Sequence, residues 1–300
     1  MSQVGCDNVN PLTVGARHAA TRRLRYNPFM ATDFSQVLAS IEPAGDAGYQ
    51  VTVPPDWLQG RTVFGGMQMA IATRVMRAAM SDEQRALPLR SAQMTFVGPV
   101  NGGEPISVRA QVLRTGRSAT HARCDLAHGE GGVACTVVGI FGVSRMSQFV
   151  REMPRPDRGR GPDDGSISMD AGLLVPAFLQ HFEARVAVGA LPYSGYAEPR
   201  SLVYVRLRDR ECGPEDALLA LADALPSPAI AMLRKPAPVS SLNWMIEILR
   251  DPAQLDLHDW VLIDTEVRAG TDGYLSQTSL LYGADGHAYS VSHQTVGVFG

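Results

Sequence analysis

Residues 60–80 read GRTVFGGMQMAIATRVMRAAM. The three glycines at the start mark a turn, and the residues after them carry apolar side chains on nearly every side of a helix. Polar side chains interrupt this surface at four positions, Gln68, Thr73, Arg74 and Arg77. Because a helix that is apolar on most sides is buried, the stretch predicts a central core helix over 67–80.

The sequence after this helix has the period of β-strands. Apolar and polar residues alternate over 106–112, and two further strand-like segments follow at 118–127 and 133–141. Only short glycine turns at 116–117 and 129–132 separate the three segments. Parallel pairing needs a long crossover connection, so these strands are predicted to form an antiparallel meander.

Residues 144–176 are rich in proline, glycine, arginine and aspartate, which indicates a linker. Beyond it, the pattern of strands, one apolar helix and further strands occurs again. The helix is predicted over 214–225. The strands are predicted at 182–188, 202–207, 242–249, 260–268, 273–282 and 287–299.

Short words repeat between the two halves. The word at 113–116, Leu-Arg-Thr-Gly, precedes Val-Arg-Ala-Gly at 267–270 by 154 residues, and glycine-rich words at 129–132 and 283–286 have the same offset. Both halves close on near-identical words, Gly-Ile-Phe-Gly and Gly-Val-Phe-Gly. Hairpin turns favour glycine in any protein, but the shared order of elements favours duplication. We therefore predict a duplicated α+β unit with Gly116 equivalent to Gly270.

Composition excludes several classes of protein. The 300 residues carry a formal net charge of −3, which gives no electrostatic reason to expect nucleic acid or a membrane as partner. The single lysine, Lys235, lies outside any phosphate-binding loop motif. The four cysteines are scattered, so neither a disulfide framework nor a zinc site is expected. We expect no metal and no cofactor.

The first 29 residues differ from the rest. They hold four arginines against one acidic residue and have no apolar segment typical of a secretory signal. We interpret residues 1–29 as a disordered tail or an upstream extension. Without a signal, the expected compartment is the cytoplasm.

Three words in this order resemble the acyl-CoA thioesterase II family: residues 63–66 before the central helix, residues 113–118 in the first meander, and residues 282–286 with Gln294 in the last hairpin. The resemblance covers about residues 33–300. It implies an α+β double hotdog, in which two repeats each wrap an antiparallel sheet around a central helix. The predicted division is an N-terminal hotdog at 30–143, a linker at 144–176 and a C-terminal hotdog at 177–300.

The resemblance also implies a function. The family hydrolyses acyl-CoA or a related acyl thioester to acid and thiol in lipid metabolism. It uses a water held by an aspartate on a strand, a hydroxyl residue on the next strand and a glutamine on the last strand. The implied partners are an acyl-CoA or acyl-carrier thioester and a second copy of the chain in a homodimer or higher homo-oligomer.

Carried onto this sequence, the catalytic glutamine is Gln294, and Asn243 stands where the family has its aspartate. The hydroxyl position falls near Val267 or Arg268, with no clean match. Glu247 shares the strand face of Asn243 and is a candidate replacement base, or else a solvated carboxylate paired with an arginine. Substrate binding is expected from Phe64, Gly65, Gly66 and Arg268, with the glycine N–H groups donating to the oxyanion.

The asparagine leaves an alternative open. An amide can hold a water but cannot take its proton, so Asn243 favours a non-hydrolytic acyl-thioester-binding hotdog protein or another acyl-processing enzyme of a biosynthetic pathway. A hotdog hydratase is a weaker third reading. A serine nucleophile is not expected, because the G-x-S-x-G motif is absent from the sequence.

Overall fold

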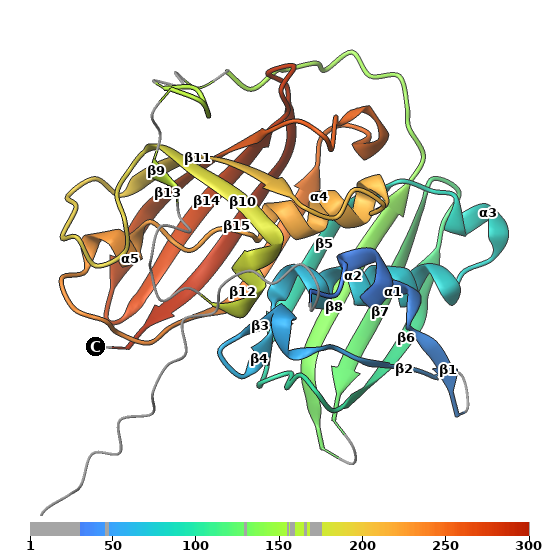
Figure 1. Ribbon diagram of the computed structural model, residues 1–300. Helices are drawn as coiled ribbons and strands as arrows, with labels where there is room; N and C mark the ends of the chain where they lie inside the picture. The colour runs from blue at the N-terminus through green and yellow to red at the C-terminus, as the bar shows by residue number, and fades with distance from the viewer. Residues whose placement is uncertain are drawn as a thin grey trace, which may run out of the picture.

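The computed structural model describes residues 31–45, 48–128, 131–154, 156, 160–164, 167–168 and 176–299. The tail predicted over 1–29 lies outside the described residues, as do parts of the predicted linker. Figure 1 shows two bodies side by side, with helices in front of a sheet that continues from one body into the other.

Helical segments are short except for two. They are α1 (Phe34–Ala39), η1 (Pro55–Trp57), α2 (Gly65–Ala78), α3 (Asp82–Arg85), η2 (Ala177–His181), α4 (Pro214–Ala222), α5 (Ala229–Met232) and η3 (Pro252–Gln254). The strands of the N-terminal half are β1 (Glu42–Ala44), β2 (Gly48–Thr52), β3 (Leu58–Gln59), β4 (Thr62–Val63), β5 (Leu89–Phe96), β6 (Pro105–Thr115), β7 (Ala119–Ala127) and β8 (Val133–Gly142). Those that follow are β9 (Ile167–Ser168), β10 (Phe182–Val188), β11 (Arg200–Leu207), β12 (Val239–Ile248), β13 (Val261–Thr271), β14 (Tyr274–Tyr282) and β15 (Ala288–Val298).

The main sheet confirms the duplication. Thirteen described strands pair in the order β1-β2-β6-β7-β8-β5-β12-β15-β14-β13-β11-β10-β9. Read outward from the central β5–β12 pair, β8, β7 and β6 on one side correspond to β15, β14 and β13 on the other. Gly116 closes the β6–β7 hairpin and Gly270 lies beside the equivalent β13–β14 turn. The chain is an α+β double hotdog, as predicted.

The two central helices, α2 and α4, lie against each other on one face of the sheet (Figure 1). Two arginines of α2 bind two acids in the first turn of α4: Arg74 contacts Asp216 at 2.7 Å and Arg77 contacts Glu215 at 2.5 Å. These pairs join the C-terminal part of α2 to the start of α4. The helices are therefore antiparallel, and the N-terminus of α2 lies beside the C-terminus of α4.

The sheet has an inner face toward these helices and an outer face away from them. Inner side chains form the main core, and a second apolar cluster that includes Tyr204 and Tyr282 covers part of the outer face. The linker contacts this face at Pro154, whose carbonyl accepts a hydrogen bond of 3.0 Å from the Tyr282 hydroxyl. Within the described residues, no helix has the length and apolar character to cross a membrane. The homodimer stays a prediction.

Candidate active site

A cavity of about 410 Å³ opens at the N-terminus of α2, where the two halves meet. Sites for small molecules usually measure roughly 300–1,000 Å³, so its size suits a ligand. Its lining joins the start of α2, the end of β5, the segment after α4 and the adjoining ends of β12 and β15. Asp223 and Arg61 are the two charged side chains among its described lining residues. The described residues contain no cluster of acids, histidines and cysteines suited to a metal.

Asp223 lines this cavity and comes directly after the last residue of α4. Gln294 Nε2 donates to its Oδ1 at 2.8 Å, and the Gly66 N–H at the start of α2 donates to the same carboxyl group. Burial raises the pKa of Asp223 to about 7, and the two donors only partly offset this rise by favouring the charged form. The result is a carboxyl group that changes protonation near neutral pH.

The glycine pair explains how a carboxylate reaches this position. A Cβ on Gly65 would collide with Asp223 Oδ2 and lie 3.2 Å from the Phe96 ring. A Cβ on Gly66 would lie 2.6 Å from the Phe64 ring and 3.1 Å from Ala220 Cα in α4. The expectation from the sequence was that these glycines let a ligand approach the backbone. In the structure, the group that lies against the backbone here is the carboxylate of Asp223.

Phe64 lies behind the cavity rather than in its lining. Its side chain is fully buried and stacks on Phe178 at 4.3 Å between ring centroids, with an angle of 7° between the planes. Phe178 does line the cavity. Phe64 therefore supports the wall, whereas Gly65 forms part of it.

Gln294 faces the cavity from β15, and two residues that sequence reasoning missed join it there. One is Asp223. The other is Ser241, which lines the cavity and pairs in register with Val296, two residues beyond Gln294 on the same strand face. A sequence signal for Asp223 existed: it is an acid at the C-terminal end of an apolar helix, where the helix dipole disfavours negative charge.

Asn243 and Glu247 lie on the opposite face of the sheet from Gln294. A bulge at Leu242 shifts the β12–β15 register, so that Ser241 opposes Val296 while Asn243 opposes Thr295. Asn243 is exposed, and its Oδ1 accepts a hydrogen bond from the Thr295 N–H at 3.1 Å. The two residues do share a face, as predicted, but the bulge turns that face away from the cavity.

Arg268 is also on the outer side. Its guanidinium contacts Glu266 at 2.7 Å and Thr278 Oγ1 at 3.4 Å, and its side chain is half exposed. The β13–β14 register shifts between Val267 and Ala269, which places Arg268 beside Thr278 rather than beside the inward-facing Gln277. The arginine that lines the cavity is Arg61, on the turn between β3 and β4.

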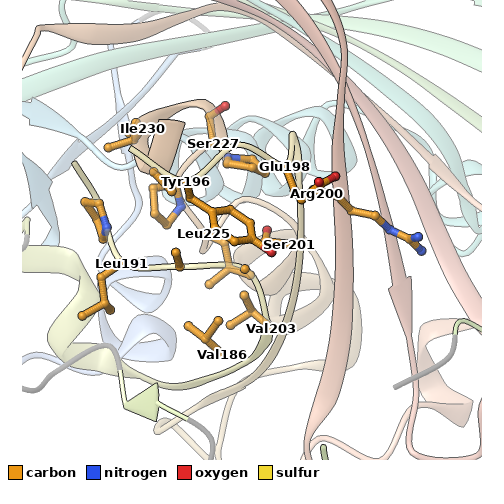
Figure 2. A pocket seen from close by; sticks show the side chains of 16 residues that line it. Val186, Leu191, Tyr196, Glu198, Arg200, Ser201, Val203, Leu225, Ser227 and Ile230 are labelled. Atoms are coloured by element: carbon orange, nitrogen blue, oxygen red, sulfur yellow. The ribbon is translucent and has the colours of Figure 1, made fainter. Parts of the chain in front are cut away.

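A second, smaller cavity of about 40 Å³ lies on the other side of the segment after α4 (Figure 2). Four residues line both cavities: Leu225, Pro226, Ser227 and Ile230. The rest of its wall is largely apolar, with Val186, Leu191 and Val203 around the space in Figure 2. Figure 2 also shows Arg200 pointing away from it, consistent with the two hydrogen bonds of 2.8 Å that Arg200 makes with Asp264.

Solved structures share this fold at low sequence identity. A protein of unknown function with a hot dog fold from Alicyclobacillus acidocaldarius is 21% identical, with 90% of this chain and 99% of that chain covered and a TM-score of 0.76. An acyl-CoA thioesterase II from Mycobacterium marinum is 17% identical, with 88% and 97% covered and a TM-score of 0.67. The dehydratase domain of PpsC from Mycobacterium tuberculosis, solved with C12:1-CoA, is 13% identical, with 86% and 96% covered and a TM-score of 0.52. The fold alone therefore does not separate hydrolysis from dehydration.

Family models give a more specific result. No curated protein sequence matches the chain significantly. The model of the acyl-CoA thioesterase N-terminal domain matches residues 53–142, and the model of the acyl-CoA thioesterase C-terminal domain matches residues 150–298. These matches cover well over half of the chain and include every residue that we place in the cavity. The chain belongs to the acyl-CoA thioesterase family of thioester hydrolases.

Proposed function

We propose that the protein hydrolyses acyl-CoA thioesters with a water molecule that Asp223 activates as general base. The observation that carries the proposal is the Asp223 carboxylate in the cavity, held by Gln294 and Gly66 with a pKa near neutrality. A base works best when its pKa lies near the operating pH. Gln294 and Ser241 share the cavity with it and would position the water.

The reaction follows in two steps. Asp223 takes a proton from the water as its oxygen attacks the thioester carbon, which gives a tetrahedral oxyanion and a protonated Asp223. The oxyanion then re-forms the carbonyl and expels the thiolate of CoA, which takes the proton from Asp223 and leaves as a thiol. The carboxylic acid product contains the oxygen atom of the water, and Asp223 is again an ionised carboxylate.

Gly65 is the best candidate for the oxyanion donor. It is the first residue of α2 and lines the cavity, and N–H groups in the first turn of a helix have no partner within the helix. The positive end of the helix dipole also favours negative charge there. The Gly66 N–H is unsuited to this role because it already donates to Asp223.

The non-hydrolytic alternative rested on Asn243, and that support is now weak. Asn243 lies on the outer face of the sheet, where its side chain accepts a hydrogen bond from the Thr295 N–H. The identity of this residue therefore does not determine which reaction takes place in the cavity. A carboxylate is present there in the form of Asp223. Hydrolysis is therefore the function that this arrangement supports best.

The pH dependence of thiol release tests the proposal. Because Asp223 must be ionised to accept a proton, kcat/KM for a short acyl-CoA is expected to rise with pH through an apparent pKa of about 7 and to level off above it. The measurement is CoA release, detected with a thiol reagent, between pH 5 and 9. A rate that is the same across this range, or the absence of release with every acyl-CoA tried, would contradict the proposal.

The second cavity is suited to the far end of the acyl chain. It adjoins the cavity of Asp223 across a shared wall, and its lining is mostly apolar. Since roughly 10–15 Å³ accommodates one water-sized group, about 40 Å³ has room for only a few methylene-sized groups. We therefore infer that the small size of this second cavity limits the length of the acyl chain.

Leu191→Ala is expected to shift the preferred acyl chain to greater length, because Leu191 lines the second cavity and its truncation enlarges that space. One methylene in an apolar pocket changes kcat/KM by about 10–200-fold, so the ratio of rates for two adjacent even chain lengths should change at least about tenfold. The measurement is kcat/KM over a series of saturated acyl-CoAs. Leu249→Ala, the same truncation at a half-exposed site that lines neither cavity, is the control. An unchanged chain-length profile in Leu191→Ala would place the acyl chain elsewhere.

A further inference from the structure

Gln294 is itself held by a second buried glutamine. Gln277 lies on β14 directly opposite Gln294 on β15, and both side chains face inward. Gln277 Nε2 donates to Gln294 Oε1 at 2.7 Å, while Gln294 Nε2 donates to Asp223 Oδ1 at 2.8 Å. The three side chains therefore form one line of hydrogen bonds that ends at the proposed base.

The direction of these bonds follows from charge. An ionised carboxylate only accepts hydrogen bonds, so Gln294 must present its NH₂ group to Asp223 and its oxygen to Gln277. Gln277 must then present its own NH₂ group to that oxygen. Gln277 donates only in this orientation, which is also the one that favours the charged form of Asp223.

The burial of Gln277 indicates that its hydrogen bond to Gln294 has a functional role. The residue is 4% exposed, and its Oε1 has no hydrogen-bond partner among the residues that the structure describes. A buried polar atom without a partner costs stability, and an apolar side chain would avoid that cost. Of its neighbours on this face besides Gln294, Val267 on β13 and Leu275 on β14 are apolar. The third, Ser279 on β14, bonds to Thr265.

We propose that Gln277 is a positioning residue for hydrolysis: it fixes the amide of Gln294 so that this amide keeps donating to the ionised carboxylate of Asp223. The inference rests on the proposed function. Gln277 lies outside the lining of the cavity and acts through Gln294 alone. Arg61 is the one other charged side chain among the described lining residues, and the lining contributed by α2, β5, β12 and β15 is uncharged.

Gln277→Met tests the proposal with a side chain of similar length that cannot donate. Gln294 is then free to turn its oxygen toward Asp223, which favours the protonated acid. We expect kcat to fall about tenfold with little change in KM, and the apparent pKa of the rate profile to rise by roughly one unit. An unchanged kcat and pH profile, even with a lowered Tm, would overturn the proposal.

Gln277→Glu is a second, independent test of the role of Gln277, for use if the methionine variant folds poorly. A protonated glutamic acid has an O–H that can replace the lost donor, whereas its ionised form can only accept. The rate should therefore rise through the pKa of Asp223 and fall again as Glu ionises at higher pH, which gives a bell-shaped profile in place of a plateau. A plateau like that of the unchanged protein would contradict the proposal.

A double-mutant cycle separates positioning from packing. If Gln277 acts through Gln294, Gln277→Met should have almost no further effect on kcat in a Gln294→Met background. The same fold-loss in both backgrounds would overturn the proposal. Thr265→Val is the matched control, because it removes a part-buried bond of 2.9 Å to Ser279, which lies on β14 as Gln277 does, without touching Gln294. It should lower Tm and leave the pH profile unchanged.

These outcomes differ from failure of the proposed function. If Asp223 is not the base, the unchanged protein will lack the rise in rate near pH 7. If only the inference about Gln277 is wrong, that rise will be present and the Gln277 variants will not move it.

Discussion

Asp223→Asn should lower kcat/KM for acyl-CoA hydrolysis by about 10²–10⁴-fold, the usual contribution of a general base. The amide keeps the size of the carboxyl group but cannot take a proton from water. The remaining rate should also lose its rise near pH 7, because the group that titrates there is gone. The measurement is thiol release at saturating and limiting substrate across pH 5–9.

The same variant makes a prediction about stability. The pKa of Asp223 is about 7 in the folded protein, against an ordinary value of 3.8 for an aspartate side chain. Between these two pH values the folded state therefore keeps a proton on Asp223 that the unfolded state has lost. The stability from this group is therefore complete below about pH 4 and declines as the pH rises to 7. The Tm of Asp223→Asn minus that of the unchanged protein should increase from pH 4 to pH 7 and stay constant above.

Asp272→Asn is the control for both measurements. It makes the same chemical change in an exposed turn with a φ of 53°, a conformation that asparagine tolerates well. Its activity and the pH dependence of its Tm should match those of the unchanged protein. If Asp223→Asn retained most of the activity, the base would be another group.

Gly65→Ala should reduce turnover by about 100-fold or more. The added methyl group would collide with Asp223 Oδ2 and crowd the Phe96 ring, so the carboxylate must leave its two donors or the two helices must separate. A displacement of about 1 Å at a reacting group can cost on the order of 10² in rate. Turnover and Tm are the quantities to measure.

Two opposing effects decide whether Gly65→Ala raises or lowers the stability of the folded protein. Alanine in place of glycine normally stabilises a helix by about 1 kcal/mol, whereas overpacking a close contact costs about 1–3 kcal/mol. We expect a net loss of stability. Gly132→Ala, where a Cβ would meet no atom of the described residues within 4 Å, is the control and should retain full activity. An active Gly65→Ala with a raised Tm would show that the contact between α2 and Asp223 is not needed.

Several features of the fold could be predicted from local patterns. The apolar surface of 67–80 predicts a buried helix, alternation over 106–112 predicts a strand, and the glycine turns at 116 and 270 mark equivalent hairpins. These signals are local because an element's period and its turns depend on neighbouring residues. The repeat then gives the second half the topology of the first. The limits of the helices differ, with α2 beginning at Gly65 and α4 ending at Ala222, and the central strand β5 is not among the predicted strands.

The candidate site could be predicted only in part. Gln294 and Gly65 line the cavity, and Gly66 donates to Asp223 beside them; the catalytic and oxyanion roles that the resemblance implies for these residues stay predictions. Alternation along a strand correctly groups Asn243 with Glu247, but it does not say which face of the sheet they occupy. That is decided by the bulge at Leu242 in the pairing of β12 with β15.

The amino-acid sequence by itself therefore determined the architecture of this protein: its elements, their duplication and its family. The tertiary structure decided which carboxylate enters the site. Asp223 directly follows α4 in one half of the chain and reaches Gly66 at the start of α2 in the other, because two antiparallel helices pack closely across two glycines. Such a meeting depends on contacts between distant segments, and no local period or spacing encodes it.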